Sequence, residues 1–62
     1  MHTIEAKDSV EIRDKDGGLW HVQVTEIDDN SLWGYYKFPD DDKYTTYTGL
    51  FEKDQHTLIG RL

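Results

Sequence analysis

Residues 20–38, WHVQVTEIDDNSLWGYYKF, decide the fold of this chain. From Trp20 to Val24 the residues alternate between apolar and polar, which is typical of a half-buried β-strand. The run 28–31, DDNS, is rich in turn-forming residues and leads into a second, aromatic-rich segment from Leu32 to Phe38. The stretch therefore predicts a β-hairpin of two strands, each with one face buried and one exposed to solvent.

The pairing inside this hairpin requires one extra residue on its first strand. With a two-residue loop at Asp29-Asn30, the apolar residues of the first strand would otherwise face the wrong side of the second, because a slip of one residue exchanges the two faces. We predict a β-bulge near Thr25-Glu26, which would also bend the sheet towards closure. The predicted pairs are then Ile27 with Leu32, Val22 with Tyr36, and Trp20 with Phe38.

The rest of the chain supplies three further segments with strand character. A first strand is predicted over Ser9 to Arg13, a fourth over Tyr44 to Phe51, and a short last one over Thr57 to Leu62, with turn residues between them. Across the loop 39–43 we expect Tyr36 opposite Thr46, Tyr35 opposite Tyr47, and Trp33 opposite Gly49. The fold class is thus all-β: a five-stranded antiparallel meander closing into a small barrel, with residues 1–62 forming a single domain. The inner face would hold Val10, Ile12, Trp20, Val22, Val24, Tyr36 and Phe38.

The segment 8–32 combines a strand, a glycine turn and a second, bent strand that ends in an apolar residue followed by aspartate: Val10-Glu11-Ile12, Asp16-Gly17, Trp20, Val24, Ile27-Asp28 and Leu32. This half of the chain resembles the first motif of Sm-like and related SH3-like barrels. Val22 stands where Sm-like proteins usually have a small residue, and Ile59-Gly60-Arg61 presents residues related to their second motif in a different order. The resemblance implies a small barrel with a bulged second strand, and it raises RNA binding by a ring oligomer as one functional expectation.

Composition restricts the classes of function. The chain has 62 residues, no cysteine, and thirteen acidic residues against seven basic ones, which gives a net charge of −6. Scattered basic residues argue against binding to a phosphate backbone, and no apolar run reaches the length of a membrane span. We see no signal peptide and expect a cytoplasmic protein. Nothing in the sequence indicates a metal or another cofactor.

An aromatic patch is the first candidate site. The odd-numbered face of the third and fourth strands would carry Trp33, Tyr35, Tyr47 and Phe51, bordered by His21. An exposed aromatic patch with a charged rim is typical of an interaction surface. Three interpretations stay open: closure of the barrel over these rings, a surface for a protein partner or for self-association, and an aromatic cage or sugar platform for a small ligand.

Acidic turns are the second candidate. Asp40, Asp41 and Asp42 form one cluster, and Asp28 and Asp29 lie in another turn. Carboxylate-rich loops can bind Ca²⁺, but solvated turn residues explain this pattern better, because no bidentate glutamate stands at the position that such a loop requires. The acidity also fits a small phage- or plasmid-type inhibitor that imitates nucleic acid and occupies a basic surface of a host protein.

Catalysis has little support in the sequence. Ser9 and Ser31 lie at a strand start and in a turn, and the three histidines show no metal-ligand spacing. His21 would face Glu11 across the first hairpin, which we interpret as a surface pair. The favoured hypothesis is therefore a non-enzymatic interaction module, with the acidic inhibitor and the Sm-like RNA-binding ring as alternatives. The partner-binding residues of the interaction module would be Trp33, Tyr35, Tyr47, Phe51, His21, Asp40, Asp41 and Asp42.

Overall fold

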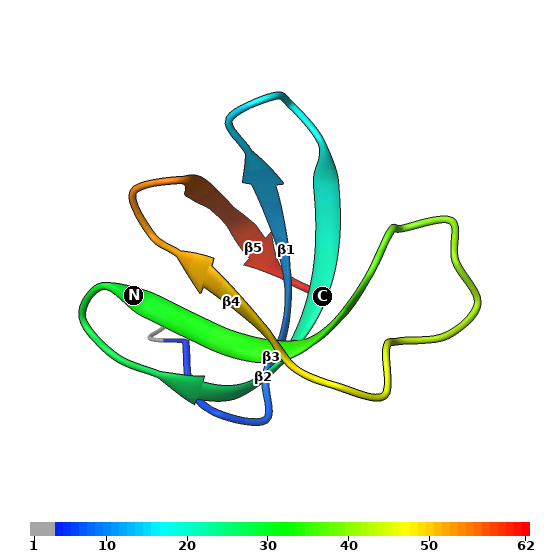
Figure 1. The fold of residues 1–62 in the computed structure, drawn as a ribbon, viewed down its shortest axis with the longest axis horizontal. Coiled ribbons are helices and arrows are strands. Elements are labelled where there is room, and N and C mark those ends of the chain that lie inside the picture. Colours follow the sequence, from blue (N-terminus) through cyan, green and yellow to red (C-terminus); the bar gives the residue numbers. More distant parts are fainter. Residues whose placement is uncertain (1–3) are drawn as a thin grey trace.

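The computed structural model describes residues 4–62, which form one antiparallel sheet of five strands (Figure 1). The strands are β1 (Ser9–Asp14), β2 (Leu19–Ile27), β3 (Ser31–Lys37), β4 (Gly49–Glu52) and β5 (His56–Arg61). The prediction of an all-β, five-stranded antiparallel fold is confirmed. Over the same residues, no helix is long and apolar enough to cross a membrane.

The strands lie in the order β4-β3-β2-β1-β5. Strands β1 to β4 follow one another as neighbours, and β5 returns to pair with β1 on the other side of the sheet. Strands β4 and β5 are therefore the two edges, and within residues 4–62 no ladder joins them. The sheet is strongly bent but does not close into the expected barrel (Figure 1). Closure would require β4 to pair with β5, and these two strands are joined only by the turn between them.

The bulge in β2 is confirmed. The register between β2 and β3 shifts between Val24 and Glu26, and the predicted pairs Val22 with Tyr36 and Ile27 with Leu32 are both present. Thr25 lies at the shift, and its hydroxyl donates a hydrogen bond to the Trp33 carbonyl oxygen at 3.2 Å. The third predicted pair does not form as a ladder pair, because β3 ends at Lys37.

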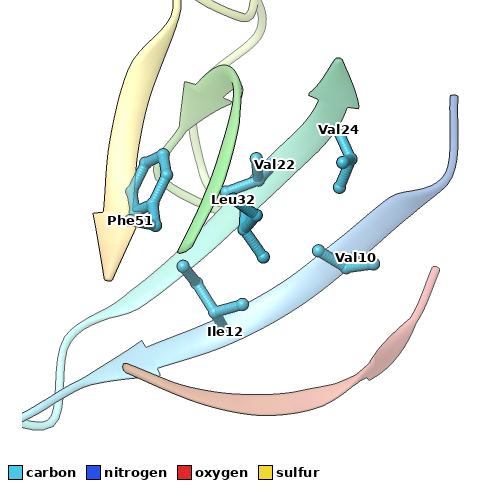
Figure 2. Close-up of a cluster of buried hydrophobic side chains, with 6 residues drawn as sticks. All are labelled: Val10, Ile12, Val22, Val24, Leu32 and Phe51. Carbon is cyan, nitrogen blue, oxygen red and sulfur yellow. The ribbon is translucent and has the colours of Figure 1, made fainter. Parts of the chain in front are cut away.

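The core lies on the inner face of the bent sheet. Six side chains are buried there, and Figure 2 shows them converging from β1, β2, β3 and β4: Val10, Ile12, Val22, Val24, Leu32 and Phe51. Trp20 and Tyr36, which we predicted as inner residues, pack against this cluster but are only half-buried. The prediction that Phe38 belongs to the inner face is wrong. Its side chain is 52% exposed, because it follows the last residue of β3 and no neighbouring strand covers it.

The prediction of the fourth strand is wrong in its start and in its register. Strand β4 begins at Gly49 instead of Tyr44, and it pairs Leu50 with Trp33 and Phe51 with Leu32. Before β4, the side chain of Thr45 replaces a backbone partner: its hydroxyl accepts the Tyr36 N–H at 3.2 Å. The register differs by one residue from the expected one, so Phe51 turns from the predicted outer patch into the core, where it is 7% exposed.

Two paired glycines lie where a side chain would clash with its neighbours. Gly34 in β3 lies opposite Gly49 in β4. A Cβ on Gly34 would come within 2.2 Å of the Gln23 carbonyl oxygen, and a Cβ on Gly49 within 2.8 Å of the Tyr36 ring. The aromatic ring that lies over Gly49 is thus Tyr36, and not Trp33 as the predicted register had it.

Candidate functional site

The predicted aromatic patch is divided between the two faces of the sheet. Trp33 and Tyr35 lie on the outer face, where Trp33 pairs with Leu50 and Tyr35 with Gln23. Tyr47 contacts the Tyr36 ring and so lies on the inner side, together with the buried Phe51. The prediction of one odd-numbered aromatic face is therefore wrong, because the register of β4 differs by one residue.

A different set of rings forms a continuous surface. We call it the aromatic strip, and it consists of Phe38, Trp20, Tyr36 and Tyr47. Phe38 stacks on Trp20 with centroids 4.3 Å apart, Trp20 meets Tyr36 edge-on at 5.7 Å, and Tyr36 meets Tyr47 edge-on at 5.9 Å. Phe38 at one end is 52% exposed and Tyr47 at the other is 63% exposed. The strip therefore presents large apolar rings to solvent on a base of packed aromatic side chains.

Asp14 fixes the indole of Trp20. The Trp20 Nε1–H donates to Asp14 Oδ2 at 3.1 Å, while Asp14 Oδ1 accepts the backbone N–H groups of Asp16 at 2.9 Å and Gly18 at 2.8 Å. These bonds favour the charged carboxylate, and the indole hydrogen bond is the largest cause that lowers the pKa of Asp14 below its ordinary 3.8. One carboxylate thus holds both the β1–β2 turn and the central ring of the strip.

Thr45 holds the other half of the strip. Besides accepting the Tyr36 N–H, it donates its own N–H to the Tyr36 carbonyl oxygen at 2.9 Å and its hydroxyl to the Tyr47 carbonyl oxygen at 2.6 Å. The side-chain hydrogen bond between Tyr36 and Tyr47 raises the pKa of the Tyr36 phenol above 10.0, with burial as a further cause. The two tyrosines are therefore coupled through their backbones and their hydroxyls.

The loop 39–43, which carries Asp40, Asp41 and Asp42, lies beside the Phe38 end of the strip. Lys37 organises this loop by donating from Nζ to three carbonyl oxygens, those of Phe38 at 3.4 Å, Pro39 at 3.2 Å and Asp41 at 3.0 Å. A hollow of about 220 Å³ separates the loop from the strip, and its lining includes Asp41, Lys43 and Tyr44. All three aspartates are exposed. The loop thus adds negative charge next to an aromatic surface.

His21 lies on the outer face, away from the strip. Its Nε2 is 3.2 Å from Glu11 Oε2, across the predicted pairing of β1 with β2. A histidine oriented by a carboxylate can act as a general base, but a nucleophile or a bound substrate would have to lie within hydrogen-bond reach. Neither His21 nor Glu11 lines any of the four hollows within residues 4–62 in which a substrate could be held.

Among residues 4–62, no three histidine, aspartate or glutamate side chains lie close enough together to hold a metal ion. Asp28 illustrates the alternative use of a turn carboxylate: its Oδ1 accepts the N–H groups of Asn30 at 2.9 Å and Ser31 at 2.8 Å. Models of protein families, curated proteins and solved structures were compared with this chain, and none of them matches it.

Sequence reasoning missed the aromatic strip because it assigned Trp20, Tyr36 and Phe38 to the core. The positions of the turn-forming glycines and of the proline contained a signal. Trp20 comes shortly after the Gly17-Gly18 turn, and Phe38 immediately precedes Pro39, which cannot continue a ladder. Both rings therefore belong to strand ends, where fewer neighbouring strands are available to cover an inner-face side chain.

Proposed function

We propose that this chain is a non-enzymatic protein-interaction module whose contact surface is the aromatic strip with the acidic loop beside it. The observation that supports the proposal is the exposure of Phe38 and Tyr47 at the two ends of a ring cluster that is otherwise packed and hydrogen-bonded. Rigid, half-exposed aromatic side chains next to charged residues are typical of the residues that dominate binding energy at protein interfaces.

The outer face supports binding less well. Its rings are less exposed than the ends of the strip: Trp33 is half-buried, and Tyr35 is exposed by only 36% beside Gln23. The exposed aromatic area of the molecule is therefore greatest on the strip. The partner is a second protein or a second copy of this chain.

The experiment compares alanine variants of the two surfaces. Phe38→Ala and Tyr47→Ala should abolish capture of the partner from a lysate, or self-association measured by light scattering, while circular dichroism stays native. Tyr35→Ala on the outer face is the matched control and should bind like the wild type. Loss of binding in Tyr35→Ala with normal binding in the two strip variants would contradict the proposal.

The exposed aspartates favour one second candidate, the acidic inhibitor that occupies a basic surface. Asp40, Asp41 and Asp42 are all exposed in one loop, and the chain carries a net charge of −6. Such binding should weaken steeply between 50 and 500 mM salt. The Debye length, beyond which exposed charges are largely screened from one another, is roughly 10 Å at 0.1 M salt and shortens as salt is added. The triple change of Asp40, Asp41 and Asp42 to asparagine should then cost more affinity than Tyr47→Ala. Binding that is insensitive to salt would exclude this candidate and leave the aromatic contact as the main one.

A further inference from the structure

The open side of the sheet contains an apolar cleft. It has a volume of about 430 Å³ and is lined by residues of all five strands, of the segment before β1 and of the β4–β5 turn: Ile4, Ile12, Ile27, Leu32, Phe51, Lys53, His56 and Leu58. Its floor includes the core residues Ile12, Leu32 and Phe51, as Figure 2 shows for their common side of the sheet. The cleft exists because β4 and β5 do not pair, so the core remains accessible between them.

The polar groups of the cleft are basic. Six lining residues are apolar, the other two are Lys53 and His56, and no carboxylate lines the cleft, although the chain has thirteen acidic residues. Lys53 donates from Nζ to the Asp28 backbone carbonyl oxygen at 2.5 Å. Neither of the ion pairs among the described residues includes Lys53. His56 meets the Phe51 ring edge-on at 5.3 Å, and its Nδ1 lies 3.0 Å from the Glu52 carbonyl oxygen.

We propose that this cleft binds a small apolar carboxylic acid, such as a medium-chain fatty acid. The tail would lie over Ile12, Leu32 and Phe51, and the carboxylate would reach the Lys53 ammonium at the rim. The volume is within the range of roughly 300–1,000 Å³ that is common for small-molecule sites, and these sites are typically apolar with a few polar groups that fix orientation. The Lys53 ammonium is the group that would hold the anionic head group.

Acidic residues near Lys53 would limit the affinity for such a ligand. A separate, polar hollow shares Lys53 and is also lined by Asp29, Glu52 and Asp54. These carboxylates attract the Lys53 ammonium and repel an approaching anion. Neutralising one of them should therefore strengthen binding, which gives the proposal a gain-of-affinity test.

The experiment titrates the whole chain with decanoate, below the concentration at which it forms micelles, and follows backbone amide signals by NMR. We expect shifts centred on Phe51, His56 and Leu58. Lys53→Gln should weaken binding about fivefold or more, since it removes the charge-assisted hydrogen bond. Asp54→Asn should strengthen it, and Leu58→Trp, which fills the cleft from a half-exposed edge position, should abolish the shifts at Phe51 and His56.

Two controls separate this site from the rest of the surface. Lys43→Gln, at the other end of the molecule next to the strip, and Tyr47→Ala should leave decanoate affinity unchanged. Equal affinity for decanol or decyltrimethylammonium would overturn the selection of an anion. Shifts centred on the aromatic strip, or no binding of decanoate to a natively folded chain, would overturn the cleft as the site.

Discussion

The centre of the sheet and its two edges differ sharply in how well they are packed. Val10 and Ile12 in β1 and Val22 in β2 are completely or almost completely buried. On the edges, Leu50 in β4 and Leu58 in β5 remain about half exposed, at 52% and 47%. Five of the six buried core side chains belong to the three central strands, and the two edge strands form an apolar rim that remains accessible, where the proposed cleft lies.

The physical reason lies in the number of neighbours. Strands β1, β2 and β3 each have a paired strand on both sides, whereas β4 and β5 have one. The edges are also irregular: β4 has four residues, and the register between β1 and β5 shifts near Ile12. Short and bulged edge strands reduce unwanted pairing with other chains, so the same irregularity that limits packing also protects the rim.

The glycines should show the largest contrast between the two regions. Gly34→Ala in β3 would place a methyl group against the Gln23 backbone, so we expect a loss of about 3 kcal/mol or more in the free energy of unfolding. Gly60→Ala in β5 meets no atom within 4 Å and should be neutral or stabilising by up to about 1 kcal/mol. Urea denaturation measures both. A similar small effect at the two sites would contradict the difference in packing.

Truncation of aliphatic side chains tests the same contrast with cavities instead of overpacking. Ile12→Ala leaves a cavity at the centre and should cost about 2–5 kcal/mol. Leu58→Ala, opposite Ile12 on the edge strand, removes a half-exposed side chain and should cost about 1 kcal/mol or less. Thermal unfolding of the two variants and the wild type gives the comparison. If Leu58→Ala is as costly as Ile12→Ala, the rim contributes more to the core than its exposure indicates.

Asp14, at the end of central strand β1, should make stability depend on acidity. Its folded-state pKa lies below the ordinary 3.8, so its contribution is complete above about pH 4 and is lost as the pH falls through the lowered value. Asp14→Asn should be less stable near neutral pH and should lose less stability on acidification. Tryptophan fluorescence during acid unfolding measures this. Asp54→Asn, in the turn between the edge strands, is the control and should follow the wild-type profile.

The smallest expected effect concerns the titration of Tyr36. Its pKa is raised in the fold, so the neutral phenol is the favoured form; this stabilisation is present below pH 10 and is lost as the pH rises through the raised value. Tyr47→Phe removes the hydrogen bond that is the main cause and should move the Tyr36 pKa back towards its ordinary value. An absorbance titration of the phenol groups detects the shift. An unchanged Tyr36 pKa in Tyr47→Phe, after subtraction of the phenol that the substitution removes, would show that the two hydroxyls do not interact.

The central hairpin could be predicted from the sequence because two independent constraints act on it. The short turn after Ile27 fixed one end of the register, and the apolar alternation around Val22 fixed the other, so the conflict between them located the bulge at Thr25. The resemblance to Sm-like barrels stays a prediction, since the five-stranded architecture alone does not distinguish one family from another.

The edges could not be predicted in the same way. A long loop between β3 and β4 leaves the register free to slip, and the side chain of Thr45 takes a partner that the prediction gave to the backbone. The observed register of β3 with β4 differs by one residue from the predicted one, so Phe51 lies in the core and Tyr47 lies beside Tyr36. The apolar cleft was unexpected for a similar reason, because its existence depends on two edge strands that fail to pair.

The return of β5 to β1 has a consequence for the order of folding. The hairpins β1–β2 and β2–β3 join residues close in sequence, but the β1–β5 ladder pairs Val10 with Arg61 and must close a loop of almost the whole chain. Long loop closure is entropically costly, so β5 should dock after the three central strands have formed and detach before they open. Native-state hydrogen exchange should then reveal β5 amides opening in a separate step of lower free energy than those of β2. Because Leu58 and His56 belong to β5, a ligand held in the cleft would slow this step and extend the lifetime of the complete sheet.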